Sequence, residues 1–80
     1  MKLPRDLSGT RLAGLLARLG YAVDHQTGSH IRLTTQVRGE HHVTIPAHGS
    51  LGPGTLNAVL KDVAEHHGMD REALMRELWG

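Results

Sequence analysis

The sequence predicts a two-layer α+β domain in which two helices cover one face of a three-stranded antiparallel sheet. Two segments, residues 8–19 and 53–67, repeat apolar side chains at the i, i+3, i+4, i+7 spacing of a helix with one buried face. Between them lie three short segments in which apolar and polar residues alternate, which is the period of a half-buried strand. Short turns join these segments, so we expect an antiparallel meander with one face packed on the helices and the other exposed.

Residues typical of helix caps mark the ends of both helices. The hydroxyl of Ser8 can cap the first helix, and Gly20 can end it. Pro53 suits the first position of the second helix, and Gly68 suits its C-terminal cap. The residues expected to face the core are Leu12, Leu15, Leu16 and Leu19 in the first helix and Leu56, Val59, Leu60, Val63 and Ala64 in the second.

The alternation also predicts which side chains of the strands face the core. In residues 21–26, Tyr21 and Val23 lie on one side of the strand. Turns at residues 27–29 and 38–40 precede the second strand and the third strand, which ends at Pro46. The side chains expected to point inward from these two strands are Ile31, Leu33, Val43 and Ile45. Those left on the open face, a surface that could meet a phosphate backbone, are His30, Arg32, Thr34, His42 and Thr44.

A short third helix is predicted after Asp70, which can cap it. We expect one domain over residues 1–80, with a core of about residues 8–68 and residues 69–80 as a C-terminal helical extension. The extension either packs on the core or offers an interaction patch to a partner. Its apolar residues are Leu74, Met75, Leu78 and Trp79.

Composition limits the classes of function. The formal net charge of +1 is too small for binding of nucleic acid by bulk charge, so the distribution of charge matters more. Tyr21 and Trp79 are the only aromatic residues, which argues against single-strand binding by stacked bases. The chain has no cysteine, hence no disulfide and no thiolate nucleophile. It has no apolar run of transmembrane length and no secretory signal, so we expect a cytoplasmic protein that does not associate with membranes.

The segment from Gln26 to His30 joins the first two strands and presents one imidazole at the start of the second. An imidazole has an ordinary pKa of about 6.5, so it can take or give a proton near neutral pH. RNA supplies its own nucleophile, because its 2′-hydroxyl can attack the adjacent phosphate once a base removes the proton. His30, on the face that carries Arg32 and His42, is thus a candidate for RNA cleavage without a metal or cofactor. The alternative is an idle surface histidine beside a hairpin turn.

The connection over residues 48–55 is rich in glycine and leads into the start of a helix, where backbone N–H groups favour an anion. Gly54 lies at this helix start, and His48 could act as a second acid or as a phosphate contact. The segment lacks the lysine and the spacing of a Walker A loop, so we infer no nucleoside triphosphate site. The same pattern also suits a plain connector.

Two pairs of adjacent histidines, His41 with His42 and His66 with His67, raise the question of zinc. Neighbouring residues on a strand point to opposite faces, and no set of convergent ligands is apparent. We therefore expect no metal site. His66 and His67, at the end of the second helix, are expected to be surface residues in a favourable position for the helix dipole.

Three motifs in order resemble the HicA toxins of bacterial and archaeal toxin–antitoxin pairs. They are Gly28-Ser29-His30, residues 43–48 (Val-Thr-Ile-Pro-Ala-His), and residues 51–56 (Leu-Gly-Pro-Gly-Thr-Leu) followed by Leu60. The resemblance covers about residues 8–68. The chain departs from it in its near-neutral charge and in the extension from residue 69 to 80.

The resemblance implies a double-stranded-RNA-binding-like α-β-β-β-α fold and a metal-independent endoribonuclease that cleaves mRNA and needs no cofactor. It implies that His30 is the catalytic residue and that a HicB-type antitoxin covers the active face. The expected RNA contacts are Ser29, Arg32, His42, His48, Gly54 and Thr55. The alternative from another class is a module with the same fold that binds RNA or a partner and performs no chemistry.

Overall fold

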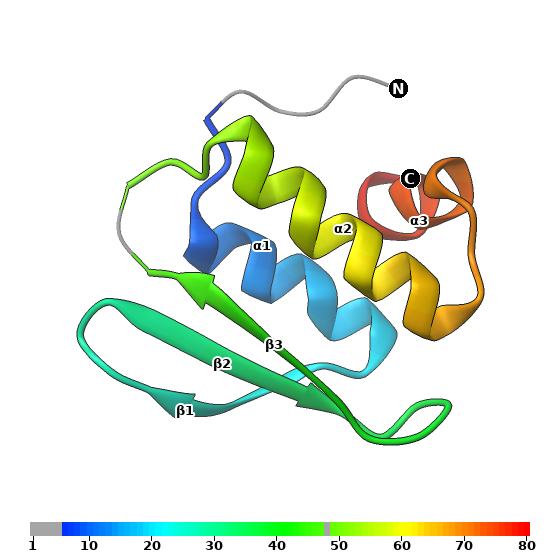
Figure 1. Cartoon of the computed structure of the whole chain (residues 1–80), viewed down its shortest axis with the longest axis horizontal. Coiled ribbons are helices and arrows are strands. Elements are labelled where there is room, and N and C mark those ends of the chain that lie inside the picture. The colour runs from blue at the N-terminus through cyan, green and yellow to red at the C-terminus, as the bar shows by residue number, and fades with distance from the viewer. Residues whose placement is uncertain (1–5, 48) are drawn as a thin grey trace.

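A computed structural model describes residues 6–47 and 49–80, so His48 lies outside the described residues. The chain folds into two layers, a sheet and a layer of helices (Figure 1). The elements in chain order are α1 (Gly9–Leu16), the short 3-10 helix η1 (Ala17–Leu19), β1 (Ala22–Gln26), β2 (His30–Thr35), β3 (His41–Pro46), α2 (Pro53–His67) and α3 (Arg71–Trp79). The predicted α+β class, with a C-terminal helix, is confirmed.

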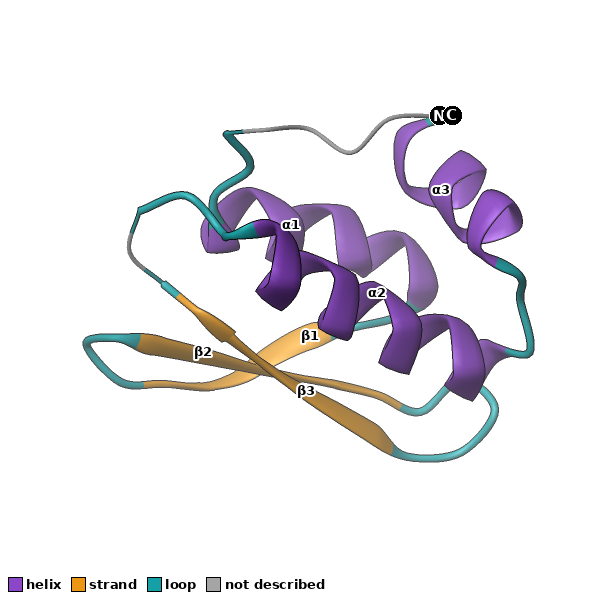
Figure 2. Cartoon of the chain, turned by 45° about the horizontal axis from the view of Figure 1, so that its top comes forward, coloured by secondary structure: helices purple, strands orange, loops and turns teal. Residues whose placement is uncertain are grey.

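The three strands form an antiparallel sheet in the order β1-β2-β3. In the pairing of β2 with β3, His30 lies opposite Pro46 and Thr34 lies opposite His42. Helices α1 and α2 run side by side over one face of the sheet, and the other face is open (Figure 2). The predicted inward residues of β2 and β3 are buried between the layers, and so are both helix stripes except Leu15, which is partly buried.

The predicted caps are confirmed. The Arg11 amide donates to Ser8 Oγ at 3.1 Å, and the Ala73 amide donates to Asp70 Oδ1 at 2.7 Å. These bonds satisfy first-turn N–H groups that have no partner inside the helix. Gly20 and Gly68 end their helices in the left-handed conformation that glycine adopts without a steric penalty.

The expectation of a half-buried first strand is wrong. Every residue of β1 is exposed, and Val23 keeps 50% of its surface accessible. Only Tyr21, just before the strand, is buried. Val23 lies opposite the buried Leu33 and therefore on the same face, but β1 is an edge strand and the helices leave that part of it uncovered. A register irregularity between Val23 and His25 then interrupts the two-residue period over the rest of the strand.

The third helix belongs to the core. Leu74, Met75 and Leu78 are buried, and α3 contacts α1 and α2. The end of α3 is joined to η1 by a hydrogen bond, in which the Arg18 guanidinium donates to the Glu77 carbonyl at 3.3 Å. The alternative of an interaction patch is therefore wrong for Leu74 and Leu78. No helix in the described residues is long and apolar enough to cross a membrane.

Helix α1 begins in direct contact with the end of β3. A Cβ atom at Gly9 would lie 1.8 Å from the carbonyl oxygen of Pro46, so the position accepts only glycine unless the backbone moves. Gly14, in the same helix, has open space where its Cβ would be. The two glycines thus form a matched pair for testing this contact.

We expect Gly9→Ala to lower the free energy of unfolding by about 1–3 kcal/mol, because the added methyl group separates α1 from β3. Gly14→Ala should be neutral or stabilising by up to about 1 kcal/mol, because alanine has the higher helix propensity. Urea unfolding of both variants measures this difference. Equal stabilities for the two variants would contradict the close contact.

Candidate functional site

His30 stands at the first position of β2, and its side chain is exposed. The backbone around it is well fixed. The Thr27 amide donates to the His30 carbonyl at 3.0 Å, and the Ala47 amide donates to the Ser29 carbonyl at 2.9 Å. The turn before β2 is therefore bonded both across the hairpin and to the end of β3, while the imidazole remains accessible to a large substrate.

A neighbouring hydroxyl orients the ring. Ser29 Oγ and His30 Nδ1 lie 3.0 Å apart, and this is the hydrogen bond to the ring within the described residues. The bond engages Nδ1 and leaves Nε2 pointing to solvent. When the hydroxyl accepts from Nδ1–H, Nε2 carries the lone pair and can remove a proton from a bound molecule.

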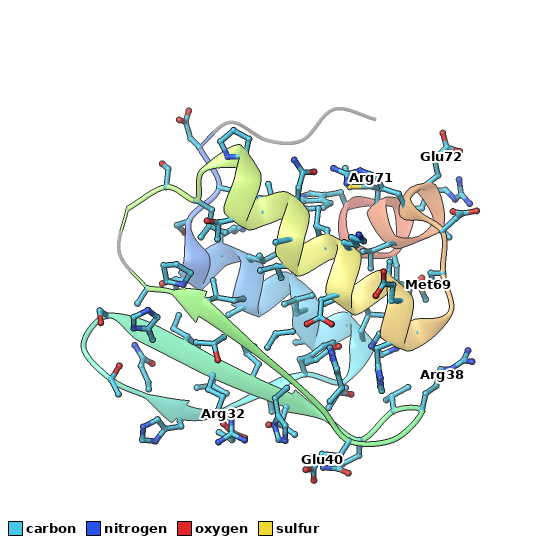
Figure 3. The ribbon with its side chains drawn as sticks, in the orientation of Figure 1. Arg32, Arg38, Glu40, Met69, Arg71 and Glu72 are labelled. Carbon is cyan, nitrogen blue, oxygen red and sulfur yellow. The ribbon has the colours of Figure 1, made fainter. Side chains whose placement is uncertain are left out.

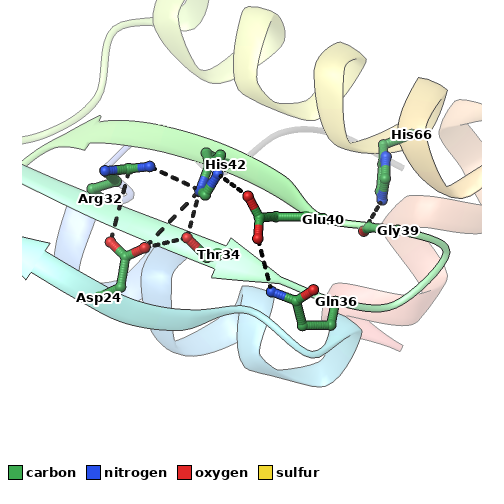
Figure 4. A network of polar contacts seen from close by, with 8 residues as sticks. All are labelled: Asp24, Arg32, Thr34, Gln36, Gly39, Glu40, His42 and His66. Atoms are coloured by element: carbon green, nitrogen blue, oxygen red, sulfur yellow. Dashed lines mark hydrogen bonds and ion pairs between the residues drawn. The ribbon is translucent and has the colours of Figure 1, made fainter.

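A second group of polar side chains lies further along the open face, and we call it the sheet-face network. Arg32 and Glu40 point away from the helices (Figure 3). The Arg32 guanidinium lies 3.9 Å from an Asp24 carboxylate oxygen and 3.2 Å from His42 Nδ1 (Figure 4). Thr34 Oγ1 contacts Asp24 and lies 2.6 Å from His42 Nδ1. His42 Nε2 donates to Glu40 at 3.0 Å.

Both carboxylates of the network are held in their charged form. The Thr34 hydroxyl, with help from Arg32, lowers the pKa of Asp24. Hydrogen bonds from Gln36 and His42 lower the pKa of Glu40. At neutral pH two negative charges therefore flank the one positive charge of Arg32. The network balances its own charge and does not leave Arg32 as an isolated anion site.

The predicted site residues His30, Arg32 and His42 lie on one face of the sheet, but they are spread along it. Arg32 is two residues from His30 along β2, which is about 7 Å. His42 lies opposite Thr34, four residues from His30, which is about 13 Å along the strand. The predicted exposure of His30, Arg32 and His42 is confirmed. Their contact with RNA stays a prediction, and one phosphate cannot contact both His30 and His42.

The predicted contacts on α2 lie beyond the start of α1. Gly54 and Thr55 are exposed in the first turn of α2, where no described side chain caps the helix. The Leu51 amide donates to the Leu7 carbonyl at 2.8 Å, so this turn is a neighbour of the α1 start. Its uncapped N–H groups can receive an anion.

A polar cluster that no sequence motif indicated lies at the other end of the sheet, where α2 ends. Tyr21 Oη lies 2.7 Å from His41 Nδ1 and 3.1 Å from His67 Nε2. His41 Nε2 lies 3.1 Å from Asp62 Oδ1, and the His41 and His66 rings stack with centroids 4.3 Å apart. His66 Nε2 donates to the Val37 and Gly39 carbonyls.

The expectation that His67 is a surface residue is wrong, since only 4% of it is accessible. A sequence signal for this exists. His67 follows Val63 by four residues and so continues the buried stripe of α2. Burial also raises the pKa of Tyr21 to about 12, with a further contribution from Asp62, so the phenol stays protonated.

Burial lowers the pKa of His67, and His66, His41 and Arg38 lower it further. The folded state therefore holds this ring neutral, whereas the unfolded chain binds a proton there once the pH falls below about 6.5. The unfolded state then carries more protons, so acid lowers the free energy of unfolding from about pH 6.5 down to the folded pKa.

We expect the wild-type chain to lose stability between about pH 7.5 and 5.5, and His67→Gln to lose less over the same interval while starting lower. His25→Gln, which changes an exposed histidine of β1, should keep the wild-type loss. Urea unfolding at both pH values measures the difference. An equal loss in all three proteins would show that His67 does not contribute.

In the described part of the chain, no group of three or more histidine, aspartate or glutamate side chains is arranged to hold a metal ion. The Tyr21 cluster is tied together by hydrogen bonds instead. Its place under the end of α2 gives it a structural role, because it joins that helix to the turn between β2 and β3.

Comparison with known proteins gives one match. A family model described as the HicA toxin of bacterial toxin-antitoxin matches residues 9–64, which is more than half of the chain. The matched range begins at the first residue of α1, includes His30 and ends within α2. No curated protein and no solved structure matches the chain.

Proposed function

Because the chain belongs to the HicA family of toxins from bacterial toxin–antitoxin systems, we propose that it is an endoribonuclease that cleaves mRNA and uses His30 as its catalytic residue. The observation that carries the proposal is the setting of His30, an exposed imidazole on a rigid turn with Nδ1 bonded to a hydroxyl and Nε2 open. A long RNA can approach such a site without entering a pocket.

In the proposed reaction, His30 Nε2 takes the proton of a ribose 2′-hydroxyl. The 2′-oxygen forms a bond to the adjacent phosphorus as the bond from phosphorus to the 5′-oxygen breaks, and the leaving oxygen takes a proton from solvent. The products are a fragment that ends in a 2′,3′-cyclic phosphate and a fragment that begins with a 5′-hydroxyl. Every bond broken or formed belongs to the RNA, so one base is sufficient for the attack.

We expect His30→Ala to slow RNA cleavage by about 10²- to 10⁴-fold, the usual contribution of a general base. The fold should survive, because the side chain is exposed and outside the core. Gel analysis of a long RNA incubated with purified protein in EDTA measures the rate. His25→Ala, an exposed histidine on the same hairpin, is the matched control and should cleave at the wild-type rate.

Undiminished cleavage by His30→Ala, with the same fragment pattern, would contradict the proposal. One observation favours a second candidate, a module that binds RNA without cutting it. Arg32 and His42 lie about 7 and 13 Å along the strand from His30, so neither is placed to assist chemistry at the imidazole. RNA that is shifted in a gel but stays intact with the wild-type protein would support this second candidate.

A toxin of this class implies an antitoxin partner, and we propose that the partner is of the HicB type and covers His30. The exposed hairpin of β1 and β2 supports this, since a protein that covers it would keep RNA from the imidazole. We expect an excess of the partner to stop cleavage by the wild-type chain. Full cleavage in the presence of a bound partner would show that it covers another surface.

A further inference from the structure

Helix α1 and the short 3-10 helix η1 carry positive charge without an acidic residue of their own. Residues 7–23 contain no aspartate or glutamate, but they contain Arg11 and Arg18. Both arginines are exposed. They are seven residues apart, nearly two helical turns, so they lie on one side of the helix about 10 Å apart along its axis.

These two arginines border an open cleft of about 450 Å³. Its lining residues are Thr10, Arg11, Gly14, Leu15 and Arg18. A Cβ atom at Gly14 would have no neighbour within 4 Å, so no described part of the chain closes the cleft there. Thr10 adds a hydroxyl between the helix start and the two cations, which suits a ligand with phosphate and sugar oxygens.

Other charged surfaces of the described chain are mixed. The sheet-face network contains two carboxylates beside Arg32. On α3, Arg76 faces Glu72 at 4.0 Å. Arg11, by contrast, forms no ion pair with a described residue. Arg18 gives one nitrogen to the Glu77 carbonyl and forms no ion pair with a described residue.

The cleft begins at the same end of the molecule as His30. His30 lies opposite Pro46, and the Pro46 carbonyl packs against Gly9. Helix α1 therefore starts beside the end of β3 (Figure 1). The imidazole and the helix lie on opposite faces of the sheet, so a strand that contacts both passes around the end of the sheet.

We propose that this cleft is a second RNA site, in which Arg11 and Arg18 hold the sugar–phosphate backbone of the substrate that His30 cuts. The inference rests on the proposed function and assigns the binding surface that the sheet lacks. Backbone contacts of this kind are insensitive to base sequence, and they depend on salt because each one releases a counterion.

The test measures RNA affinity as a function of salt, with the full chain carrying His30→Ala so that the RNA stays intact. We expect Arg11→Gln and Arg18→Gln each to weaken binding of a labelled RNA several-fold. Each should reduce the slope of log affinity against log salt by about 0.7 for single strands or 0.9 for duplexes. Arg11→Lys should keep the slope. Arg76→Gln is the matched control and should bind like the parent, since its charge is paired with Glu72.

Thermal unfolding of each variant checks that α3 stays in place when Arg18→Gln removes the hydrogen bond to the Glu77 carbonyl. Arg11→Gln tests the cleft and leaves that hydrogen bond intact. If both variants fold and keep the parent's salt slope, the cleft is not an RNA site. If the chain that carries His30 still cuts RNA in that case, the catalytic proposal stands. Variants that bind RNA normally but lose an acidic partner protein would overturn it as well. Failure of the parent to bind RNA, together with failure of the wild-type chain to cut it, would overturn the proposed function itself.

Discussion

The close contact between α1 and the end of β3 determines where the candidate site residues lie. Gly9 lets the helix start against the Pro46 carbonyl, and Pro46 is the ladder partner of His30. The next residue, Ala47, bonds to the turn that carries Ser29. One small contact thus fixes three segments that are far apart in the sequence: the helix start, the last strand and the turn before His30.

The two ends of the sheet have different physical characters. At the His30 end the side chains are exposed and make few bonds, which leaves them available to a substrate. At the other end, Tyr21 and three histidines are joined by hydrogen bonds and ring contacts, and His67 is buried. The histidines therefore differ in their setting, since some of these rings form structure and the His30 ring is left exposed.

The sequence was a good guide wherever one local rule decided the outcome. Ser8, Asp70 and Gly68 act as caps because capping depends on a few adjacent residues. Local rules failed where contacts between distant parts of the chain decided which side chains are buried. Val23 follows the alternation of a buried strand and lies opposite the buried Leu33, yet it stays exposed because the helices do not cover this edge of the sheet. The candidate site shows the same division. The exposure of His30 could be predicted from the period of β2, but the pairing of Arg32 with Asp24 depends on the register between strands, which no local pattern gives.

A base at His30 removes a proton from the RNA's own 2′-hydroxyl in the proposed reaction, and this step fixes the chemistry of the fragment ends. It is tested most directly by the mass of the fragments that the wild-type chain releases from a short RNA of defined sequence in EDTA. We expect 5′ fragments that end in a 2′,3′-cyclic phosphate, or its hydrolysis product, and 3′ fragments that begin with a 5′-hydroxyl. Fragments with a 5′-phosphate and a free 3′-hydroxyl would show that water attacks the phosphorus, and they would contradict attack by the 2′-hydroxyl.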